Sequence, residues 1–447
     1  MVVFGWNNVE RKEGEGMYRN MINDLAAWTE QEHRELLLLK GAKGVGKTWC
    51  VVDFAEAFFA HTIHIDFEQD TVLRELFMTP NSAEFIDEQL ELLTDLNFQK
   101  EDMSQVLFVF DEVQVEEDLF AGVLQYARQR RHFSVIMIAS WTGMLPAENL
   151  VADEILVKTM YPMSFEEFMI ANKAQELCRI IEQEKVNGLQ NDLKPMILDY
   201  LKTFFIIGGM PEVVQDYIRH KDMQRVDVLQ HQILQNLRDD ILRYAPKVMV
   251  KKILQVWDSI PTQLTKENKK FMYGVVDEKA RAREYVGAVE WLVNAGYVRK
   301  IRKVSQGSAP LEEHVEPKSF ELYHLDHGLL RNVAEITATD ADADENIFDS
   351  MHGILAEQMV LSELTLNENV HELYFWTSDA TARIDFIFED DGEVIPVDVQ
   401  TRIRTKAQNL KVFHQKYNNR MAIRISLEEL GFHKGMLNVP LYGLWNF

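Results

Sequence analysis

The sequence has few cysteines, no long apolar run and no recognisable export signal. Its 447 residues include two cysteines, Cys50 and Cys178, which are too few for a disulfide framework or for a zinc site of their own. We expect Cys50 to be a buried thiol, because it falls in a predicted helix beside a sheet. No apolar run approaches the roughly 20 residues of a membrane span, and residues 1–15 lack a basic start followed by an apolar core. The sequence therefore predicts a soluble, cytoplasmic protein with no membrane partner.

Basic residues are scarce relative to acidic ones. The chain has 47 Lys and Arg against 71 Asp and Glu, a formal net charge of -24. Such an excess repels polyanions over the surface as a whole, so broad, sequence-independent binding of nucleic acid is disfavoured, although a local basic face stays open. The apolar share of 47% is typical of globular proteins, and the length predicts about three domains.

The clearest motif lies between an apolar run, Leu36–Leu39, and an amphipathic segment, Trp49–Phe59. It reads Gly41, Ala42, Lys43, Gly44, Val45, Gly46, Lys47, Thr48. Strand, glycine-rich loop and helix in this order predict a phosphate-binding P-loop, with Trp49 as a further nucleotide contact. The glycines let backbone N–H groups approach phosphate oxygens, while Lys47 would contact the β- and γ-phosphates of ATP and Thr48 would offer a hydroxyl to Mg²⁺.

A second motif follows about 60 residues later. Residues 106–110 form a continuous apolar run, as expected for a central parallel strand, and the run ends in Asp111 and Glu112. The carboxyl ends of parallel strands meet at one edge of a sheet, so these acids would face the P-loop. We expect Asp111 to hold Mg²⁺ through water and Glu112 to polarise the attacking water.

Further strands complete the predicted sheet. Phe133–Ala139 is apolar and ends at Ser140, a polar residue placed to touch the γ-phosphate or the water; an ordinary strand-ending turn is the alternative. Thr62–Phe67 and Ile155–Val157 are also predicted strands. Their alternation with helices predicts a parallel α/β sheet over residues 1–160.

Residues 161–244 carry a helical pattern. Ser164 and Glu167 have the spacing of a capping box, and the run Gly208-Gly209-Met210-Pro211-Glu212 interrupts the helices. The segment is predicted to form a helical lid.

Residues 245–336 contain two helical stripes followed by two extended segments, which suggests a winged helix. Lys279, Arg281 and Arg283 would lie at the start of its recognition helix, where DNA-reading modules place base contacts. The alternative is a solvated helix start in a domain used for packing.

Residues 337–447 begin with a short acidic stretch, 337–345, which reads as a linker. Glu357 falls on the apolar stripe of the next predicted helix. Arg383–Phe388 and Glu393–Gln400 are predicted strands, and pairing Phe388 with Glu393 would place Asp385, Asp398 and Gln400 on one face. Three acids, Glu357, Asp385 and Asp398, would then converge.

Several of these segments resemble the prokaryotic ATPases of the AAA+ superfamily. The P-loop, residues 106–112, the run 161–168 and the Gly-Gly-Met-Pro-Glu break carry this resemblance, and residues 322–330 and 353–357 resemble the domain that these proteins carry behind the ATPase. The resemblance implies an α/β fold: a five-stranded P-loop AAA+ sheet with a helical lid, then a winged helix and an α/β domain similar to PD-(D/E)xK nucleases.

The resemblance also assigns roles to individual residues. Lys47 and Thr48 become the phosphate and Mg²⁺ contacts, Asp111 the Walker B acid, Glu112 the base and Ser140 the sensor. In the nuclease-like part, Glu357, Asp385 and Asp398 match the acidic positions, but Gln400 replaces the expected lysine. Because that ammonium would orient water and offset phosphate charge, we expect an inactive nuclease site.

A further departure from the AAA+ ATPases concerns the arginine finger that is common in them. The segment Trp141–Lys158 after the sensor strand contains no arginine, and Arg128, Arg130 and Arg131 are the nearest candidates. A slow monomeric or dimeric switch fits as well as a ring, so self-association stays open.

The leading hypothesis is an ATP- and Mg²⁺-dependent ATPase that acts as a nucleotide-dependent switch. The alternatives are a nucleotide-gated DNA-binding or protein-interaction module with negligible hydrolysis, and an ATP-regulated nuclease whose cleavage would be lost in Asp385→Ala.

Overall fold

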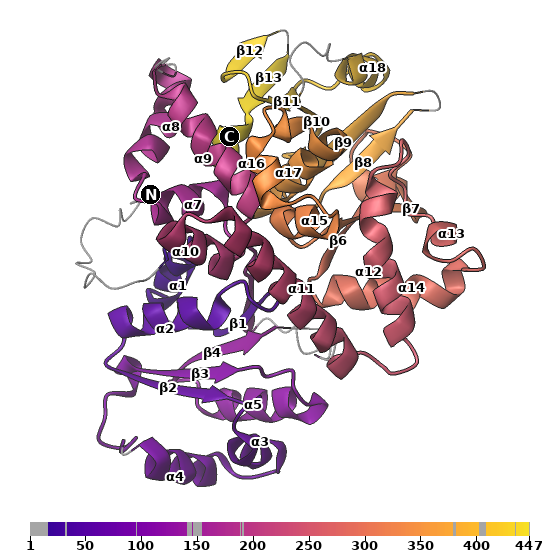
Figure 1. The fold of residues 1–447 in the computed structure, drawn as a ribbon. Helices are drawn as coiled ribbons and strands as arrows, with labels where there is room; N and C mark the ends of the chain where they lie inside the picture. Colours follow the sequence, from indigo (N-terminus) through magenta and orange to yellow (C-terminus); the bar gives the residue numbers. More distant parts are fainter. Residues whose placement is uncertain are drawn as a thin grey trace.

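The computed structural model places an α/β layer at one end of the molecule and a mixed sheet at the other, with helices between them (Figure 1). The structure describes residues 17–31, 34–94, 96–140, 145, 154–187, 189, 192–378, 381–401, 408–433 and 435–446. Within these residues no helix is long and apolar enough to cross a membrane.

The N-terminal sheet is fully parallel and has the strand order β2-β3-β4-β1-β5. Its strands are β1 (Leu36–Lys40), β2 (His61–Asp66), β3 (Val106–Asp111), β4 (Ser134–Ala139) and β5 (Ile155–Thr159). All predicted strands, including the fifth, are confirmed. The order places β1 between the central strand β4 and the edge strand β5, so the P-loop emerges beside the end of β4.

Alternate side chains of the central strands serve two separate cores. Leu37 and Val109 face the core that contains α1 and α2, whereas Leu38 and Phe108 face the core of α3, α4 and α5. Both faces of the sheet are therefore buried, which explains the continuous apolar runs. The helices are α1 (Met21–Thr29), α2 (Lys47–Phe58), α3 (Thr71–Met78), α4 (Ala83–Thr94) and α5 (Glu117–Gln129), with a short 3₁₀ helix η1 (Met103–Gln105) before β3. Cys50 on α2 is buried, as expected.

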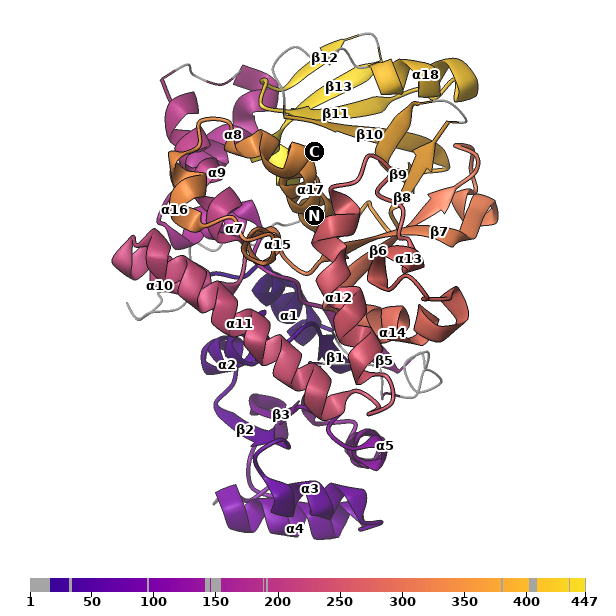
Figure 2. The ribbon, with the colours of Figure 1, turned by 45° about the vertical axis from the view of Figure 1, so that its right-hand side comes forward.

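Helices α7 to α11 follow the sheet. They are α7 (Phe165–Ala171), α8 (Gln175–Asn187), α9 (Lys194–Ile207), α10 (Pro211–His220) and α11 (Met223–Tyr244). The predicted capping box at the start of α7 is present: Ser164 Oγ accepts from the Glu167 amide at 3.1 Å, and Glu167 Oε2 accepts from the Ser164 amide at 3.0 Å. The long helix α11 runs diagonally from α10 back toward β1 (Figure 2), so the end of this helical segment returns to the P-loop.

The next elements are α12 (Val250–Leu264), α13 (Tyr273–Val276), α14 (Ala282–Asn294), β6 (Val298–Val304), η2 (Leu311–His314) and β7 (Val315–His324). Helices followed by the antiparallel β6–β7 pair match the order of elements expected for a winged helix. However, β6 also pairs in parallel with β8, Arg302 lying opposite Tyr374. The boundary predicted between residues 336 and 337 thus falls between strands that share one sheet.

That second sheet has eight strands in the order β12-β13-β11-β10-β9-β8-β6-β7. The remaining elements are α15 (His327–Val333), α16 (Ala338–Ala343), η3 (Ile347–Gly353), α17 (Ile354–Leu366), β8 (Tyr374–Thr377), β9 (Arg383–Asp390), β10 (Glu393–Gln400), α18 (Gln408–Tyr417), β11 (Ala422–Ser426), β12 (Gly431–His433), β13 (Met436–Pro440) and η4 (Leu441–Asn446). Helix α17 packs against β10 and carries buried residues around its whole circumference.

Two predictions for this region are wrong. Residues 337–345 are not a linker, because Thr337 caps α16, and Ala338 and Ala341 are buried where this helix packs on α9 and α11. The predicted pairing of Phe388 with Glu393 is also wrong, since Phe388 lies opposite Ile395. The strands continue to a two-residue turn, Asp391 and Gly392, both at positive φ. A shift of two residues keeps every side chain on its predicted face.

Candidate functional site

The loop between β1 and α2 has the backbone that a P-loop requires. Gly44 and Gly46 have φ of 84° and 91°, a region that favours glycine. A Cβ at Gly44 would lie 3.2 Å from Met210 Cε, and one at Gly46 would lie 3.5 Å from Pro211 Cγ. The start of α10 is therefore packed directly on this loop, and larger residues would separate the two.

Lys47 lies at the centre of the site. Its Nζ donates hydrogen bonds to the carbonyl oxygens of Gly41 at 2.9 Å and Ala42 at 3.0 Å, and to Ser140 Oγ at 3.0 Å. Burial lowers the pKa of Lys47 to about 8, against the opposing charges of Glu112 and Asp111. The ammonium is thus held among oxygen atoms at the base of the loop.

Thr48 and Asp111 form the second contact of the site. Thr48 Oγ1 donates to Asp111 Oδ2 at 2.6 Å, which joins the first turn of α2 to the end of β3. His64 Nε2, on β2, lies 3.4 Å from the same carboxylate oxygen. The hydroxyl and the carboxylate assigned to Mg²⁺ from the sequence are therefore adjacent.

Glu112 and Ser140 are also brought together. Ser140 Oγ donates to Glu112 Oε1, and the Gln114 side-chain amide donates to Glu112 Oε2. Burial raises the pKa of Glu112, partly offset by the Lys47 charge. Glu112 has a φ of 55°, a left-handed conformation that non-glycine residues seldom adopt. Ser140 accordingly bridges the proposed base and the P-loop lysine, at the end of β4 where it was predicted.

These residues line a cavity of about 480 Å³, a volume typical of small-molecule sites. Of the P-loop residues, Lys43, Gly44, Gly46, Lys47, Thr48 and Trp49 line it, together with Asp111, Glu112 and Ser140. Trp49 is 39% exposed. Val45 is buried beneath the loop, while Gly41 and Ala42 face a different cavity.

Arg19 is a residue of this cavity that the sequence did not single out. Its guanidinium donates to the carbonyl oxygens of Val45 at 2.5 Å and Tyr161 at 2.7 Å, and to Glu167 Oε2 at 3.1 Å. Its side chain is 4% exposed. A lone arginine in the N-terminal segment carries no motif, and its carboxylate partner lies 148 residues away.

A second set of contacts, from the end of α11, was also missed. Lys43 Nζ lies 3.3 Å from Asp240 and 3.7 Å from Glu68, and Tyr297 donates to the other oxygen of Asp240 at 3.2 Å. Burial acts to lower the pKa of Lys43, but the charges of Asp240 and Glu68 outweigh it and raise the value. The P-loop is thus tied to the far end of α11.

The C-terminal acids lie together, but each has protein partners. Burial raises the pKa values of Glu357 and Asp398, and the charge of Asp385 adds to both effects. Lys269 pairs with Glu357, Arg383 Nε donates to Asp385 at 3.2 Å, and Asp398 accepts from the side chains of Gln400 and Asn409. Among the described residues no group of three or more His, Cys, Asp or Glu is arranged to hold a metal ion. The three acids are therefore part of a buried network of ion pairs and hydrogen bonds.

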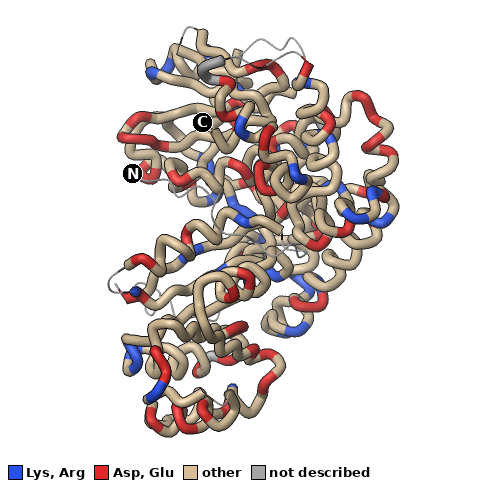
Figure 3. Tube along the Cα trace, turned by 90° about the vertical axis from the view of Figure 1, so that its left-hand side faces the viewer, with Lys and Arg blue, Asp and Glu red and all other residues tan. Residues whose placement is uncertain are grey.

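The predicted arginine-finger candidates are engaged within the chain. Arg128 and Arg131 both pair with Glu154, at 3.1 and 2.8 Å, and Arg130 pairs with Asp87 at 2.7 Å. The basic residues considered for DNA contact, Lys279, Arg281 and Arg283, are exposed at the start of α14. Figure 3 shows acidic residues distributed along the whole trace.

The fold and the site define a P-loop α/β architecture of the AAA+ type. Consistent with this, residues 33–169 match a family model described as an AAA domain. Two other models match the rest of the chain, both described as domains of unknown function: DUF8612 over residues 198–340 and DUF4143 over residues 352–444. The chain therefore carries an AAA domain followed by two further regions. A search of the curated proteins finds no match to this chain.

Three chains are among the solved structures with a partly similar fold. The Walker-type ATPase PABY2304 of Pyrococcus abyssi is 14% identical with a TM-score of 0.43, covering 70% of this chain and 94% of that one. The Thermotoga maritima RuvB Holliday junction branch migration motor is 12% identical, with a TM-score of 0.29 and coverage of 63% and 89%. C. elegans PCH-2 is 16% identical, with a TM-score of 0.28 and coverage of 44% and 61%. These likenesses extend to parts of the fold only.

Proposed function

We propose that this chain binds ATP with Mg²⁺, hydrolyses it slowly and acts as a nucleotide-dependent switch on its C-terminal half. The observation that carries the proposal is the convergence of Lys47, Thr48–Asp111 and Glu112–Ser140 on one cavity at the edge of a parallel sheet. Each residue type has a separate task in phosphoryl transfer. Hydrogen bonds link Lys47 to Glu112 through Ser140, and Thr48 to Asp111.

The residues present fit a magnesium ion. Thr48 Oγ1 and Asp111 Oδ2 are hard oxygen donors 2.6 Å apart, and Mg²⁺ is commonly held by one or two protein oxygens together with water and substrate phosphates. When bound, the ion would neutralise charge on the β- and γ-phosphates. In this proposal Thr48 and Asp111 hold it.

The chain's own groups supply the remaining steps. Lys47 would leave its carbonyl contacts to pair with phosphate oxygens, and the amides of the P-loop would bind the same oxygens. Glu112 would accept a hydrogen bond from the attacking water, and Ser140 would hold Glu112 and sense the γ-phosphate through Lys47. Burial raises the pKa of Glu112 toward the operating pH, and a general base is most effective when its pKa lies near that pH.

The switch role rests on a chain of contacts from the P-loop to α15. Met210 and Pro211 pack on the loop, the Gly209 amide donates to Asp326 Oδ2 at 2.7 Å, and Asp326 also caps α15 by accepting from Leu329 at 3.0 Å. A change at the nucleotide would therefore reach the C-terminal half within a few contacts. The start of α10 is thus an element that both the nucleotide site and the C-terminal half could bias. Coupling between two sites requires such an element.

Two substitutions test the ATPase proposal. Lys47→Ala should abolish ATP binding in equilibrium titrations, because the phosphate charge loses its ammonium partner. Glu112→Gln should retain ATP binding while steady-state phosphate release falls about 100-fold or more. The exposed Lys279→Ala is the matched control and should behave as the unsubstituted protein does. Undiminished turnover in Glu112→Gln would remove Glu112 from the role of base.

A nucleotide-gated binding module with negligible hydrolysis is the second candidate. Arg19 lines the cavity, but its donors already serve Val45, Tyr161 and Glu167, so it is poorly placed to stabilise charge on the γ-phosphate. A rate of phosphate release no higher than that of ATP without protein, both with and without duplex DNA, would favour this candidate. The nuclease alternative has less support, because Lys269 pairs with Glu357 and Arg383 pairs with Asp385, and Gln400 stands where a lysine is expected.

A further inference from the structure

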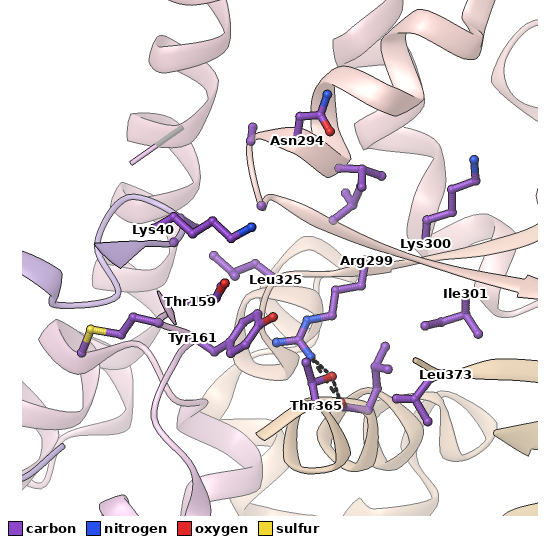
Figure 4. A pocket seen from close by; sticks show the side chains of 18 of the residues that line it. Lys40, Thr159, Tyr161, Asn294, Arg299, Lys300, Ile301, Leu325, Thr365 and Leu373 are labelled. Atoms are coloured by element: carbon purple, nitrogen blue, oxygen red, sulfur yellow. Dashed lines mark hydrogen bonds between the residues drawn. The ribbon is translucent and has the colours of Figure 1, made fainter. Parts of the chain in front are cut away.

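A second cavity, of about 430 Å³, lies on the other side of the P-loop. Its walls come from the ends of β1 and β5, the end of α14, strand β6, helix α17 and residues 370–373 (Figure 4). It is therefore enclosed between the AAA domain and the C-terminal half. The catalytic assignment above does not use this space, although its volume is also in the range of small-molecule sites.

Lys40 provides the first cation of this cavity. It is the last residue of β1, and its side chain extends into the cavity (Figure 4). Burial lowers the pKa of Lys40, and no carboxylate in the described part of the chain pairs with it. A half-buried ammonium without a counter-charge is costly, so an anion in the cavity would stabilise it.

Arg299, on β6, provides the second cation. Its Nη1 donates to the Leu361 carbonyl oxygen at 3.2 Å and to Thr365 Oγ1, and the guanidinium lies over the Tyr161 ring at 4.6 Å (Figure 4). Nη2 is buried and has no hydrogen-bond partner among the described residues. Leaving a buried charged donor unpaired is costly, so a bound acceptor would be favoured.

The rest of the lining selects for an organic anion. The carboxylate of Glu372 on one wall is paired with Arg302, so it does not oppose an anion. The Lys300 ammonium lies over the Phe320 ring at 4.7 Å and extends away from Arg299 (Figure 4). Leu325 and Leu373 give part of the wall an apolar character. A ligand that fits this combination carries a negatively charged group at one end and a short apolar body at the other.

We propose that this cavity binds a small organic anion, a carboxylate or a phosphate ester with a short apolar body, recognised by Lys40 and Arg299. Ser140 lines both this cavity and the nucleotide cavity, and Gly41 and Ala42 form part of the wall. A Cβ at Gly296, beside the cavity, would lie 3.5 Å from the Ala42 nitrogen. An occupant would thus touch the P-loop from behind. The site goes beyond the proposed ATPase function, and its binding step does not depend on hydrolysis.

Calorimetric titration of the full chain with phenyl phosphate and with benzoate tests the proposal. These probes share an apolar ring and differ in the anionic group, so their relative affinities distinguish a phosphate ester from a carboxylate ligand. Repeating the titrations with the P-loop saturated by a non-hydrolysable ATP analogue separates this cavity from the P-loop. We expect at least one probe to bind at a single site, and to bind there also in the presence of the analogue.

Substitutions of the lining locate the binding. Lys40→Met should weaken binding about tenfold or more, whereas Lys40→Arg should retain it. Lys303→Met is the matched control, because Lys303 lies on the same strand as Arg299 and pairs with Glu316 outside the cavity. Arg299→Met is a second lining variant for the case that Lys40→Met does not fold, as judged by circular dichroism.

Three outcomes would overturn the proposal. The first is no binding of either probe at millimolar concentration. The second is unchanged affinity in folded Lys40→Met or Arg299→Met protein. The third is loss of binding when the P-loop is saturated with the ATP analogue, which would place the probe on the P-loop. None of these outcomes bears on whether ATP is hydrolysed, so failure here and failure of the ATPase proposal are distinguishable.

Discussion

Arg19 shows how a single side chain can hold the nucleotide site in shape. It joins three parts of the chain, through Val45 in the P-loop, Tyr161 after β5 and Glu167 in the capping box of α7. Both members of the Arg19–Glu167 pair are buried, at 4% and 5% exposure. Removing one partner of a buried pair leaves the other charge uncompensated.

We expect Arg19→Met to lower the free energy of unfolding by about 3 to 5 kcal/mol, measured by urea denaturation. Methionine fills similar space but donates no hydrogen bond, so Glu167 and two carbonyl oxygens lose their partner. Arg179→Met is the control, because Arg179 and Glu176 form an exposed pair that should contribute under about 0.5 kcal/mol. Equal effects of the two substitutions would show that Arg19 has no special structural role.

At the scale of single residues, the sequence predicted the residues that belong to local motifs. The eight P-loop residues, Asp111, Glu112 and Ser140 were placed correctly relative to their strands, because glycine spacing and strand ends are local features. Arg19 and the Lys43–Asp240 contact were not predicted, because each depends on a partner more than 140 residues away. Pairing across that separation leaves no trace in a local pattern.

At the scale of elements, helix α17 is joined to α7 by a buried carboxyl group. Glu363 Oε1 accepts from the Phe165 amide at 2.8 Å. Burial raises the pKa of Glu363 to about 8, and the charges of Glu167 and Glu166 add to the effect. The folded protein therefore holds a proton here at neutral pH, whereas the unfolded chain releases it above about 4.5.

Linkage gives this contact a pH dependence. The pKa of Glu363 is higher in the folded protein than in the unfolded chain. The contribution of Glu363 to stability is therefore complete below about pH 4.5 and is lost as pH rises toward 8. The slope would reach about 1.4 kcal/mol per pH unit within that window. Glu363→Gln should remove this part of the pH dependence, measured as thermal melting between pH 5 and 8, while exposed Glu176→Gln should not. An unchanged slope in Glu363→Gln would refute the assignment.

Elements were predicted well where the sequence has a strong period or run. The five strands of the AAA domain and the capping box at Ser164 are of this kind. Helix α16 was missed because its alternation of Ala and Asp has no apolar stripe; its burial comes from α9 and α11. The predicted β9–β10 register was shifted by two residues, because the turn has two residues and is shorter than the gap between the predicted strands 383–388 and 393–400.

At the scale of the whole molecule, the eight-stranded sheet joins segments that the sequence assigned to separate domains. Strand β6 pairs with β8 across more than 70 residues. Parallel pairing needs no short turn and so has no local signal. The cavity behind the P-loop, which requires both halves of the chain, was unpredictable for the same reason.

The arginine residues that precede β4 bear on whether several copies of the chain assemble. Arg128, Arg130 and Arg131 are each paired with a carboxylate of their own chain, and AAA+ activation in trans would require such a group to be free. We expect phosphate release per chain to be independent of protein concentration, and light scattering to give the mass of one chain with and without a non-hydrolysable ATP analogue. Arg130→Ala should leave turnover unchanged. A larger mass with the analogue, together with loss of turnover in Arg130→Ala, would instead establish an arginine finger.

The contact of Gly208 with Asp326 limits how this molecule can move. A Cβ at Gly208 would lie 2.2 Å from Asp326 Oδ1, and one at Gly209 would lie 2.3 Å from the Met163 carbonyl oxygen. The turn between α9 and α10 is therefore wedged between two parts of the chain and cannot serve as a free hinge. In the switch proposed above, a rotation at the start of α10 would therefore be transmitted to α15 through the contact between Gly209 and Asp326.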